Sequence, residues 1–244
     1  KDRLGLPSDT PELHLPSPFD YRRQALLYVA RDLPDPRSPA YAARSYAAIE
    51  ALVGLTRGRA LVLFTSRERM NEAHAALGTR WDWPTLVQGQ GSKEALLSRF
   101  RETPGAVLFA TATFWEGVDI VGEALSLVII DKLPFAPPGD PLVDARVARL
   151  NAEGRNAFVD YQVPSAILAL KQGVGRLIRH RNDRGIIAIL DPRLETARYG
   201  ELFIASLPPA RRTSRFAELE AWWGELEVQP PQEMDRPLRA IASV

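Results

Sequence analysis

Residues 167–191 read ILALKQGVGRLIRHRNDRGIIAILD and join an amphipathic pattern to an uninterrupted apolar run. The apolar side chains that recur at helical spacing are Ile167, Leu170, Val174, Leu177 and Ile178. Pro164 suits the first turn of such a helix, where its missing N–H has no partner to lose. Gly185–Leu190 is apolar throughout, as in a strand buried on both faces. The stretch therefore predicts a helix that packs beside a parallel strand.

The polar side of this predicted helix carries Gln172, Arg176 and Arg179 at i, i+4 and i+7, so all three should share one face. Gly173 and Gly175 interrupt the pattern, and each should cost about 1 kcal/mol relative to alanine. A solvated face does not need two glycines, whereas a close approach to another surface does. Guanidinium groups suit phosphate oxygens. Because such a face is most often ordinary surface, the pattern alone leaves both a phosphate site and a solvated surface open.

Similar apolar runs recur along the chain, separated by helical patterns. The predicted strands are Gln24–Ala30, Ala60–Ser66, Thr85–Val87, Gly105–Ala110 and Leu125–Ile130. The predicted helices are Tyr41–Leu55, Arg67–Leu77, Lys93–Arg101, Leu142–Leu150 and Glu195–Ser206, with Ser92 as the N-cap of the third. Strands without polar alternation that are separated by helices indicate an α/β fold, a parallel sheet with helices on both faces.

Polar residues follow several of these strands. They are Thr65, Ser66, Gln88, Thr111–Thr113 and Asp131. Because ligands of open parallel sheets bind beyond the carboxyl ends of the strands, these residues are candidates for holding phosphate groups. Each could equally cap the helix that follows it. Their common edge favours a ligand.

Composition is ordinary for a soluble globular protein, with 45% hydrophobic and 25% charged residues and a net charge of +1. A basic surface must therefore be local. The chain has no cysteine, which excludes disulfides and thiolate metal sites, and its three histidines show no ligand spacing, so we predict no metal site. No apolar run is long enough for a membrane span, and we expect a cytoplasmic location. We expect an irregular arm over 1–20, one α/β domain over 21–210 and a loose tail over 211–244.

A second signature, FWEGVD, occupies residues 114–119 after a predicted strand. Gly117 permits a sharp turn, and Glu116 and Asp119 place carboxylates on the loop. Such carboxylates can hold a ribose hydroxyl, orient an arginine or act through metal-bound water. An acidic turn paired with surface cations explains the signature equally well.

Taken together, these stretches resemble motifs IV, V and VI of superfamily 2 helicases, and their particular residues resemble the DinG/XPD-type DNA helicases. The matching stretches are LVLFTS at 61–66, FWEGVDIVG at 114–122, KQGVGRLIR at 171–179 and ILDPRL at 189–194. SPFDY at 17–21 and DKLPF at 131–135 also look like this family. The resemblance runs from about Ser17 to Leu207, and the motif VI wording is its most specific part.

The resemblance implies the second of two RecA-like motor domains. Arg176 and Arg179 would contact the γ-phosphate of ATP from across the interdomain cleft, one of them as an arginine finger. Gln172 would position the nucleotide or the attacking water. The nucleotide contacts of motif V would be Glu116, Gly117 and Asp119, with Glu116 also linking the nucleotide and DNA sites. The contacts to DNA would be Thr65, Ser66 and Thr111, with Arg67 and Gln88 as weaker candidates.

The chain departs from the family in lacking a GxxxxGK[ST] loop, a DEAH-like box and the four cysteines of an iron–sulfur cluster. All of these belong to the first motor domain. We therefore expect a piece of a longer protein that does not hydrolyse ATP alone. ATP and Mg²⁺ would be bound mainly by the missing domain, which could also carry an iron–sulfur cluster. The expected partners are single-stranded DNA, ATP and the N-terminal motor domain of the same protein, and the piece itself should be monomeric.

Two other functions stay open. One is a non-catalytic RecA-like module for nucleic-acid binding or regulation. The other is a different superfamily 2 translocase domain that acts on RNA or as a remodeller, since a domain that grips phosphates does not reveal the sugar. For the helicase, the family implies 5′→3′ unwinding.

Overall fold

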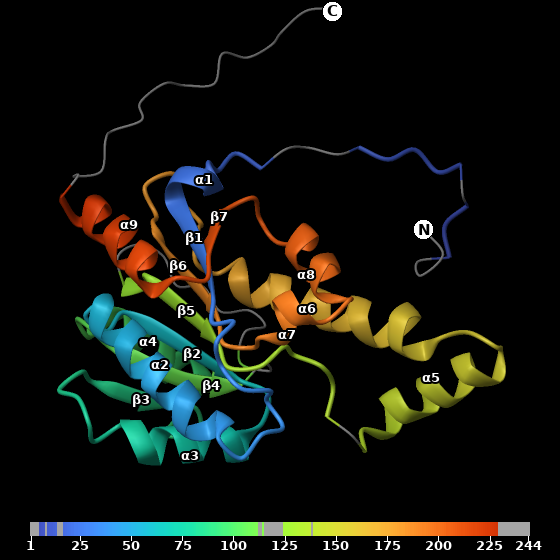
Figure 1. The fold of residues 1–244 in the computed structure, drawn as a ribbon, viewed down its shortest axis with the longest axis horizontal. Helices are drawn as coiled ribbons and strands as arrows, with labels where there is room; N and C mark the ends of the chain where they lie inside the picture. The colour runs from blue at the N-terminus through green and yellow to red at the C-terminus, as the bar shows by residue number, and fades with distance from the viewer. Residues whose placement is uncertain are drawn as a thin grey trace, which may run out of the picture.

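The computed structural model describes residues 5–7, 9–13, 17–111, 114, 124–137 and 139–228. Within them, a seven-stranded sheet has the order β3-β4-β2-β5-β6-β1-β7, and every neighbouring pair is parallel (Figure 1). The strands are β1 Ala25–Val29, β2 Ala60–Phe64, β3 Thr85–Val87, β4 Val107–Thr111, β5 Leu127–Ile130, β6 Gly185–Ile189 and β7 Arg211–Thr213. The predicted parallel α/β fold is confirmed.

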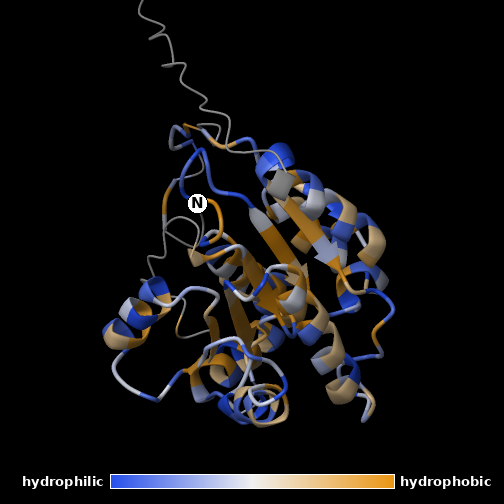
Figure 2. Ribbon diagram, turned by 90° about the vertical axis from the view of Figure 1, so that its left-hand side faces the viewer, coloured by the Kyte–Doolittle hydropathy of each residue, from blue (hydrophilic) through white to orange (hydrophobic). Residues whose placement is uncertain are grey.

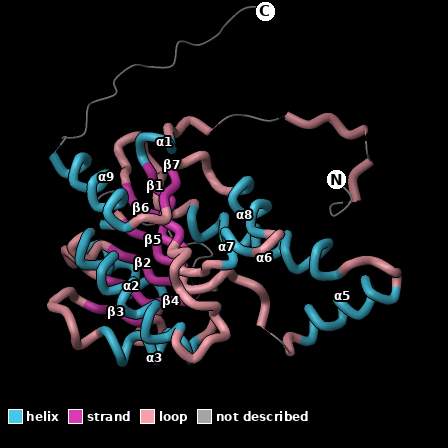
Figure 3. Tube along the Cα trace, viewed as in Figure 1, coloured by secondary structure: helices cyan, strands magenta, loops and turns pink. Residues whose placement is uncertain are grey.

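Helices connect the strands and cover both faces of the sheet (Figure 3). They are α1 Tyr21–Gln24, α2 Tyr41–Leu55, α3 Arg67–Leu77, α4 Lys93–Glu102, α5 Pro141–Ala152, the π-helix η4 Phe158–Gln162, α6 Val163–Val174, α7 Arg193–Thr196, α8 Gly200–Ser206 and α9 Phe216–Val228. The predicted N-cap at Ser92 is confirmed, because its side chain accepts a hydrogen bond from the Ala95 N–H. Helix α5 buries none of its residues and projects away from the sheet (Figure 1).

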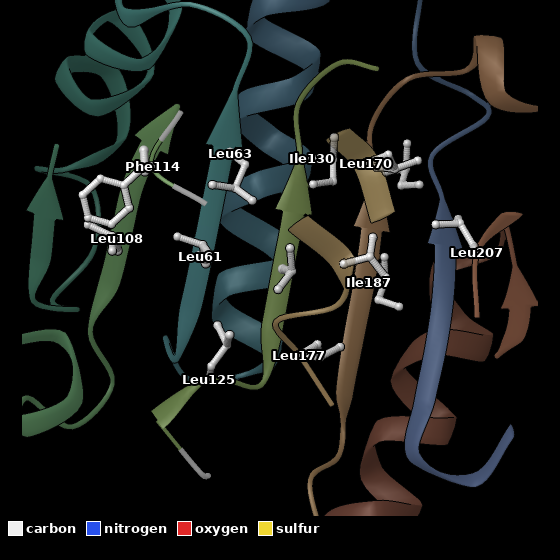
Figure 4. Close-up of a cluster of buried hydrophobic side chains, with 14 of the residues drawn as sticks. Leu61, Leu63, Leu108, Phe114, Leu125, Ile130, Leu170, Leu177, Ile187 and Leu207 are labelled. Carbon is white, nitrogen blue, oxygen red and sulfur yellow. The ribbon is translucent and has the colours of Figure 1, made fainter. Parts of the chain in front are cut away.

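The core consists of two apolar layers, one on each face of the sheet. On one face the strands pack against α4, α6 and α8, and on the other against α2, α3 and α9. Figure 4 shows part of the first layer, where Leu170 from α6 and Leu207 after α8 approach the strand residues. All five residues of β1, β2, β4 and β6 are buried, so these strands are apolar on both faces (Figure 2).

Residues 211–228 differ from the expected loose tail. β7 pairs with β1 through Leu26 and Arg211, and α9 covers one face of the sheet with the buried side chains of Leu219, Trp222 and Trp223. The RRT sequence of β7 carries no apolar run because an edge strand is exposed on its outer side. The sheet domain therefore extends beyond the predicted boundary.

The predicted helix Glu195–Ser206 is divided in the structure into α7 and α8. At the start of α8 the backbone of Gly200 lies against the carbonyl group of Leu194, and a Cβ atom at Gly200 would overlap that carbonyl. The chain can turn this closely only because position 200 has no side chain. In the part of the chain that the structure describes, no helix is long and apolar enough to cross a membrane.

Candidate functional site

The arginine-bearing segment leaves α6 earlier than the sequence predicts. The helix ends at Val174, and the Gly175 N–H bonds to the Lys171 carbonyl at 2.9 Å with an ordinary φ of −64°. A turn follows, in which the Arg176 N–H bonds to the Gly173 carbonyl at 3.2 Å. The prediction that Gln172, Arg176 and Arg179 lie on one helix face is therefore wrong, because only Gln172 is still helical.

A short loop follows the helix, and in this loop the apolar side chains are buried while the charged residues are partly exposed. Leu177 and Ile178 are buried in the core, whereas Arg176 and Arg179 on either side of them are partly exposed. The Nε atoms of both arginines are nevertheless buried. The protein therefore encloses part of each arginine side chain, although both residues are partly exposed.

The loop that carries these arginines, residues 176–184, is tied to the rest of the fold by two polar side chains. The Asp183 carboxylate accepts hydrogen bonds from the N–H groups of Arg179 and His180, both at 2.8 Å. The amide of Gln24, at the end of α1, donates to three carbonyl groups of the same loop. Gln24 is absent from the sequence prediction of the site, since its contacts lie more than 150 residues away along the chain and no local pattern marks them.

The arginine loop lies at the edge of the sheet where the strands begin. The side chain of Leu177, which is labelled in Figure 4, packs against Gly185, the first residue of β6. A Cβ atom at Gly185 would meet Leu177 Cδ1 at 2.6 Å. Gln24, which holds the loop, directly precedes β1. In the chain, α6 follows β5 and precedes β6, and it packs on one face of the sheet. The loop after α6 leads into the first residue of β6, so the arginines of this loop lie at the amino edge of the sheet.

Most of the candidate residues for DNA lie at the opposite, carboxyl edge. The Gln88 Oε1 atom accepts hydrogen bonds from the Thr111 N–H at 2.7 Å and from its hydroxyl at 2.9 Å. Thr111 pairs with Phe64 in the sheet, so Thr65 follows directly beside it. The structure therefore brings the ends of β3, β4 and β2 together, as their adjacency in a parallel sheet predicts.

The three residues after β2 differ in exposure. Thr65 is partly exposed, and Ser66 and Arg67 are exposed, whereas Thr111 is buried. Ser66 is also the N-cap of α3, and its side-chain oxygen accepts the Arg69 N–H at 3.2 Å. Ser66 therefore caps α3 and is also exposed at the carboxyl edge of the sheet.

Asp131, which the sequence places with the strand-end ligands, lies in a buried ion pair instead. Its carboxylate is fully buried, and the Arg69 Nε atom approaches its Oδ2 atom to 3.3 Å and Arg69 Nη2 its Oδ1 to 3.4 Å. Arg69 also donates to the Ser45 hydroxyl at 2.7 Å and the Tyr46 hydroxyl at 2.8 Å. The Tyr41 hydroxyl donates to the Asp131 carbonyl. Asp131 is therefore not available to a ligand.

The titration of this cluster follows from its burial. Burial raises the pKa of the Asp131 carboxyl, against the opposing effects of the Arg69 guanidinium and the Tyr41 hydroxyl. Burial, followed by the charge of Asp131, also raises the pKa of the Tyr41 hydroxyl, which stays a neutral donor. The neighbouring strand β6 leads to a second buried carboxylate, Asp191, which binds Arg193 Nη2 at 2.6 Å and accepts the Leu133 N–H at 2.9 Å. Both carboxylates hold the fold together.

Glu116, Gly117 and Asp119, the predicted motif V residues, lie outside the described residues. Among the residues that the structure describes, no group of three or more histidine, cysteine, aspartate or glutamate side chains could hold a metal ion.

Comparison with known proteins identifies the family. The profile of the helicase C-terminal domain matches residues 49–210. The chain is 46% identical over 215 residues to the ATP-dependent DNA helicase YoaA of Escherichia coli (strain K12), covering 88% of this chain and 34% of that protein. It is 41% identical over 220 residues to the ATP-dependent helicase DinG of Mycobacterium tuberculosis (strain ATCC 25618 / H37Rv), covering 89% of this chain and 33% of that protein. It is 34% identical over 231 residues to the 3′-5′ exonuclease DinG of Bacillus subtilis (strain 168), covering 91% of this chain and 25% of that protein.

Solved structures agree with the fold. An XPD helicase superposes with a TM-score of 0.62 at 21% identity, over 78% of this chain and 36% of that chain. Dbp5 of S. cerevisiae, bound to RNA and ADP BeF3, superposes with a TM-score of 0.55 at 16% identity, over 85% of this chain and 46% of that chain. The chain spans about a third of the length of the first two relatives. It belongs to the helicase C-terminal domain family, as a RecA-like domain of the DinG/XPD type.

Proposed function

We propose that this chain is the second motor domain of an ATP-dependent DNA helicase that unwinds 5′→3′. It supplies an arginine finger from Arg176 or Arg179, positions nucleotide or water with Gln172, and forms part of the track for single-stranded DNA. The observation that carries the proposal is the separation of two kinds of group on one sheet. Anchored arginines lie at the amino edge, and exposed hydroxyls lie at the carboxyl edge.

This separation supports a motor because each edge can serve a different ligand. Guanidinium groups that are held at their stems stabilise the charge of phosphoryl transfer when another domain brings ATP to them. Closing of a cleft between two domains then makes the position of the DNA grip depend on the state of ATP. ATP with Mg²⁺ would be held mainly by the first motor domain, and Glu116, Gly117 and Asp119 would add nucleotide contacts from this chain.

The full-length protein and this chain alone test the proposal together. The full-length protein should hydrolyse ATP in response to single-stranded DNA and separate a duplex with a 5′ overhang but not one with a 3′ overhang. The chain alone should show no hydrolysis above background and should regain it on mixing with the upstream part of the same protein. Hydrolysis by the chain alone, or an inactive full-length protein that is folded, would contradict the assignment.

A non-catalytic RecA-like module is the second candidate. It is favoured by the relative of Bacillus subtilis, which carries a homologous segment and is named an exonuclease. A full-length protein that binds single-stranded DNA but hydrolyses no ATP would support this module.

At the carboxyl edge, Ser66 is proposed to donate its hydroxyl proton to a DNA phosphate. Because the Ser66 oxygen accepts the Arg69 N–H, its proton remains available as a donor to DNA. Thr65 and Arg67 would contact the same strand, and the pair of Gln88 and Thr111 would shape the edge beside them.

The two N-cap serines provide a matched test of this contact. Ser66→Ala and Ser92→Ala each remove a cap bond of 3.2 Å and should each lower the stability by about 1 kcal/mol. Only Ser66→Ala should also weaken binding of single-stranded DNA, by about 1 kcal/mol or roughly fivefold. Fluorescence anisotropy with a labelled oligonucleotide at fixed salt measures the affinity, and thermal melting measures the stability. Equal affinities of the two variants would remove Ser66 from the DNA track.

A further inference from the structure

The amide of Gln24 makes an unusual set of contacts to the arginine loop. The side chain is 4% exposed, and its Nε2 atom donates to the carbonyl groups of His180 at 2.9 Å, Arg181 at 3.1 Å and Asp183 at 3.0 Å. Because an amide has only two N–H groups, the three acceptors share them. A single buried residue next to β1 thus satisfies three carbonyl groups of a loop that precedes β6.

Asp183 holds the same loop from within. Its carboxylate accepts the N–H groups of Arg179 and His180, while its own backbone N–H bonds to the His180 carbonyl at 3.2 Å. Three carbonyl groups of the loop therefore accept hydrogen bonds from Gln24, and two backbone N–H groups of the loop donate to the Asp183 carboxylate. The backbone that carries Arg179 is fixed on both sides.

The start of the loop is fixed by packing. Leu177 and Ile178 are buried, and Leu177 lies against Gly185. Arg176 and Arg179 therefore leave a segment whose apolar part is embedded in the core and whose polar part is bonded to Gln24. The direction of both guanidinium groups depends on this backbone.

We propose that Gln24 is a positioning residue for the arginines of this domain: it holds the loop so that Arg176 and Arg179 meet the phosphates of ATP in the correct place. This inference rests on the proposed function. Gln24 touches no reacting group itself and acts through the carbonyl groups of His180, Arg181 and Asp183. A misplacement of about 1 Å at a reacting group can reduce a rate by about 10²-fold, so the contribution of such a residue is measurable.

The test replaces Gln24 by methionine in the full-length protein. Methionine has a similar volume and suits a buried position, but it donates no hydrogen bond. We expect kcat of DNA-stimulated ATP hydrolysis to fall by roughly 10- to 100-fold, with a smaller change in the KM for ATP. Gln24→Asn, which keeps a shorter donor, should give an intermediate loss and guards against a variant that does not fold.

A double-mutant cycle separates positioning from general damage. If Gln24 acts through the arginines, Gln24→Met should produce little further loss in the background of Arg176→Ala or Arg179→Ala, whichever is inactive. Thr56→Val is the matched control, since the fully buried Thr56 hydroxyl donates to the Gly58 carbonyl at 2.6 Å and does not contact the arginine loop. It should lower the melting temperature without the loss in kcat.

The outcomes distinguish this inference from the proposed function. Wild-type kcat in both Gln24 variants, with Arg176→Ala inactive, would overturn the positioning role alone. An equal loss from Gln24→Met in the wild-type, Arg176→Ala and Arg179→Ala backgrounds would also overturn it, because the effect would then be independent of both arginines. Full activity of both Arg176→Ala and Arg179→Ala would instead contradict the arginine assignment itself.

Discussion

Replacing Arg176 by alanine in the full-length protein is expected to reduce DNA-stimulated ATP hydrolysis by about 10³-fold or more, the contribution that an arginine finger makes to phosphoryl transfer. The guanidinium would stabilise charge that develops mainly in the transition state, so kcat should fall far more than affinity for ATP. Arg176 is partly exposed and lies after the end of α6, so the fold should persist. Steady-state kinetics with and without single-stranded DNA measure the effect.

Two further variants sharpen this result. Arg176→Lys keeps the charge but loses the planar fork of donors, so it should recover little of the rate. Arg149→Ala makes the same change in charge on α5, where Arg149 forms an exposed pair with Glu153 at 2.8 Å, and should leave the rate unchanged. Near-normal turnover of Arg176→Ala would transfer the role to Arg179 if Arg179→Ala is inactive, and would end the arginine-finger assignment if both variants are active.

Most strands that the sequence predicts correctly are buried on both faces, and the exception is the short edge strand β3. An uninterrupted apolar run is stable only when it is buried, so these strands can be recognised from the sequence. The predicted run Ala60–Ser66 matches β2 to within two residues. β7 was not predictable in this way, because its charged edge residues Arg211 and Arg212 resemble a loop. Its place in the sheet depends on pairing with β1, which is distant in the sequence.

The site shows the same division between local and distant information. The sequence KQGVGRLIR indicates the family. Helical spacing, however, wrongly places its arginines on one helix face, since α6 ends at Val174. Asp131 and Asp191 look alike as acidic residues that follow apolar strands. Only the packing of Arg69 and Arg193 against them shows that both are structural.

Replacing Asp131 by alanine is expected to lower the free energy of unfolding of this chain by about 3–5 kcal/mol. The change leaves the guanidinium of Arg69, whose side chain is 11% exposed, with only a longer contact of 3.9 Å to the exposed carboxylate of Glu72. A buried charge that loses its buried partner is costly because the protein interior does not solvate it as water does. Urea unfolding followed by circular dichroism measures the change, and an unaltered m value would show that the two-state transition is preserved.

The exposed pair of Asp35 and Arg37 provides the matched control. Its atoms approach to 3.0 Å and the side-chain hydrogen bond from Arg37 lowers the pKa of Asp35 to about 2, yet the side chains are 43% and 86% exposed. Because water solvates whichever partner remains, Asp35→Ala should leave the unfolding midpoint unchanged. Replacing both buried partners, in Asp131→Leu combined with Arg69→Met, should recover much of the lost stability, since no charge is then left buried. If the double variant were no more stable than Asp131→Ala alone, the loss would come from packing or from the Tyr41 contact rather than from the stranded charge of Arg69.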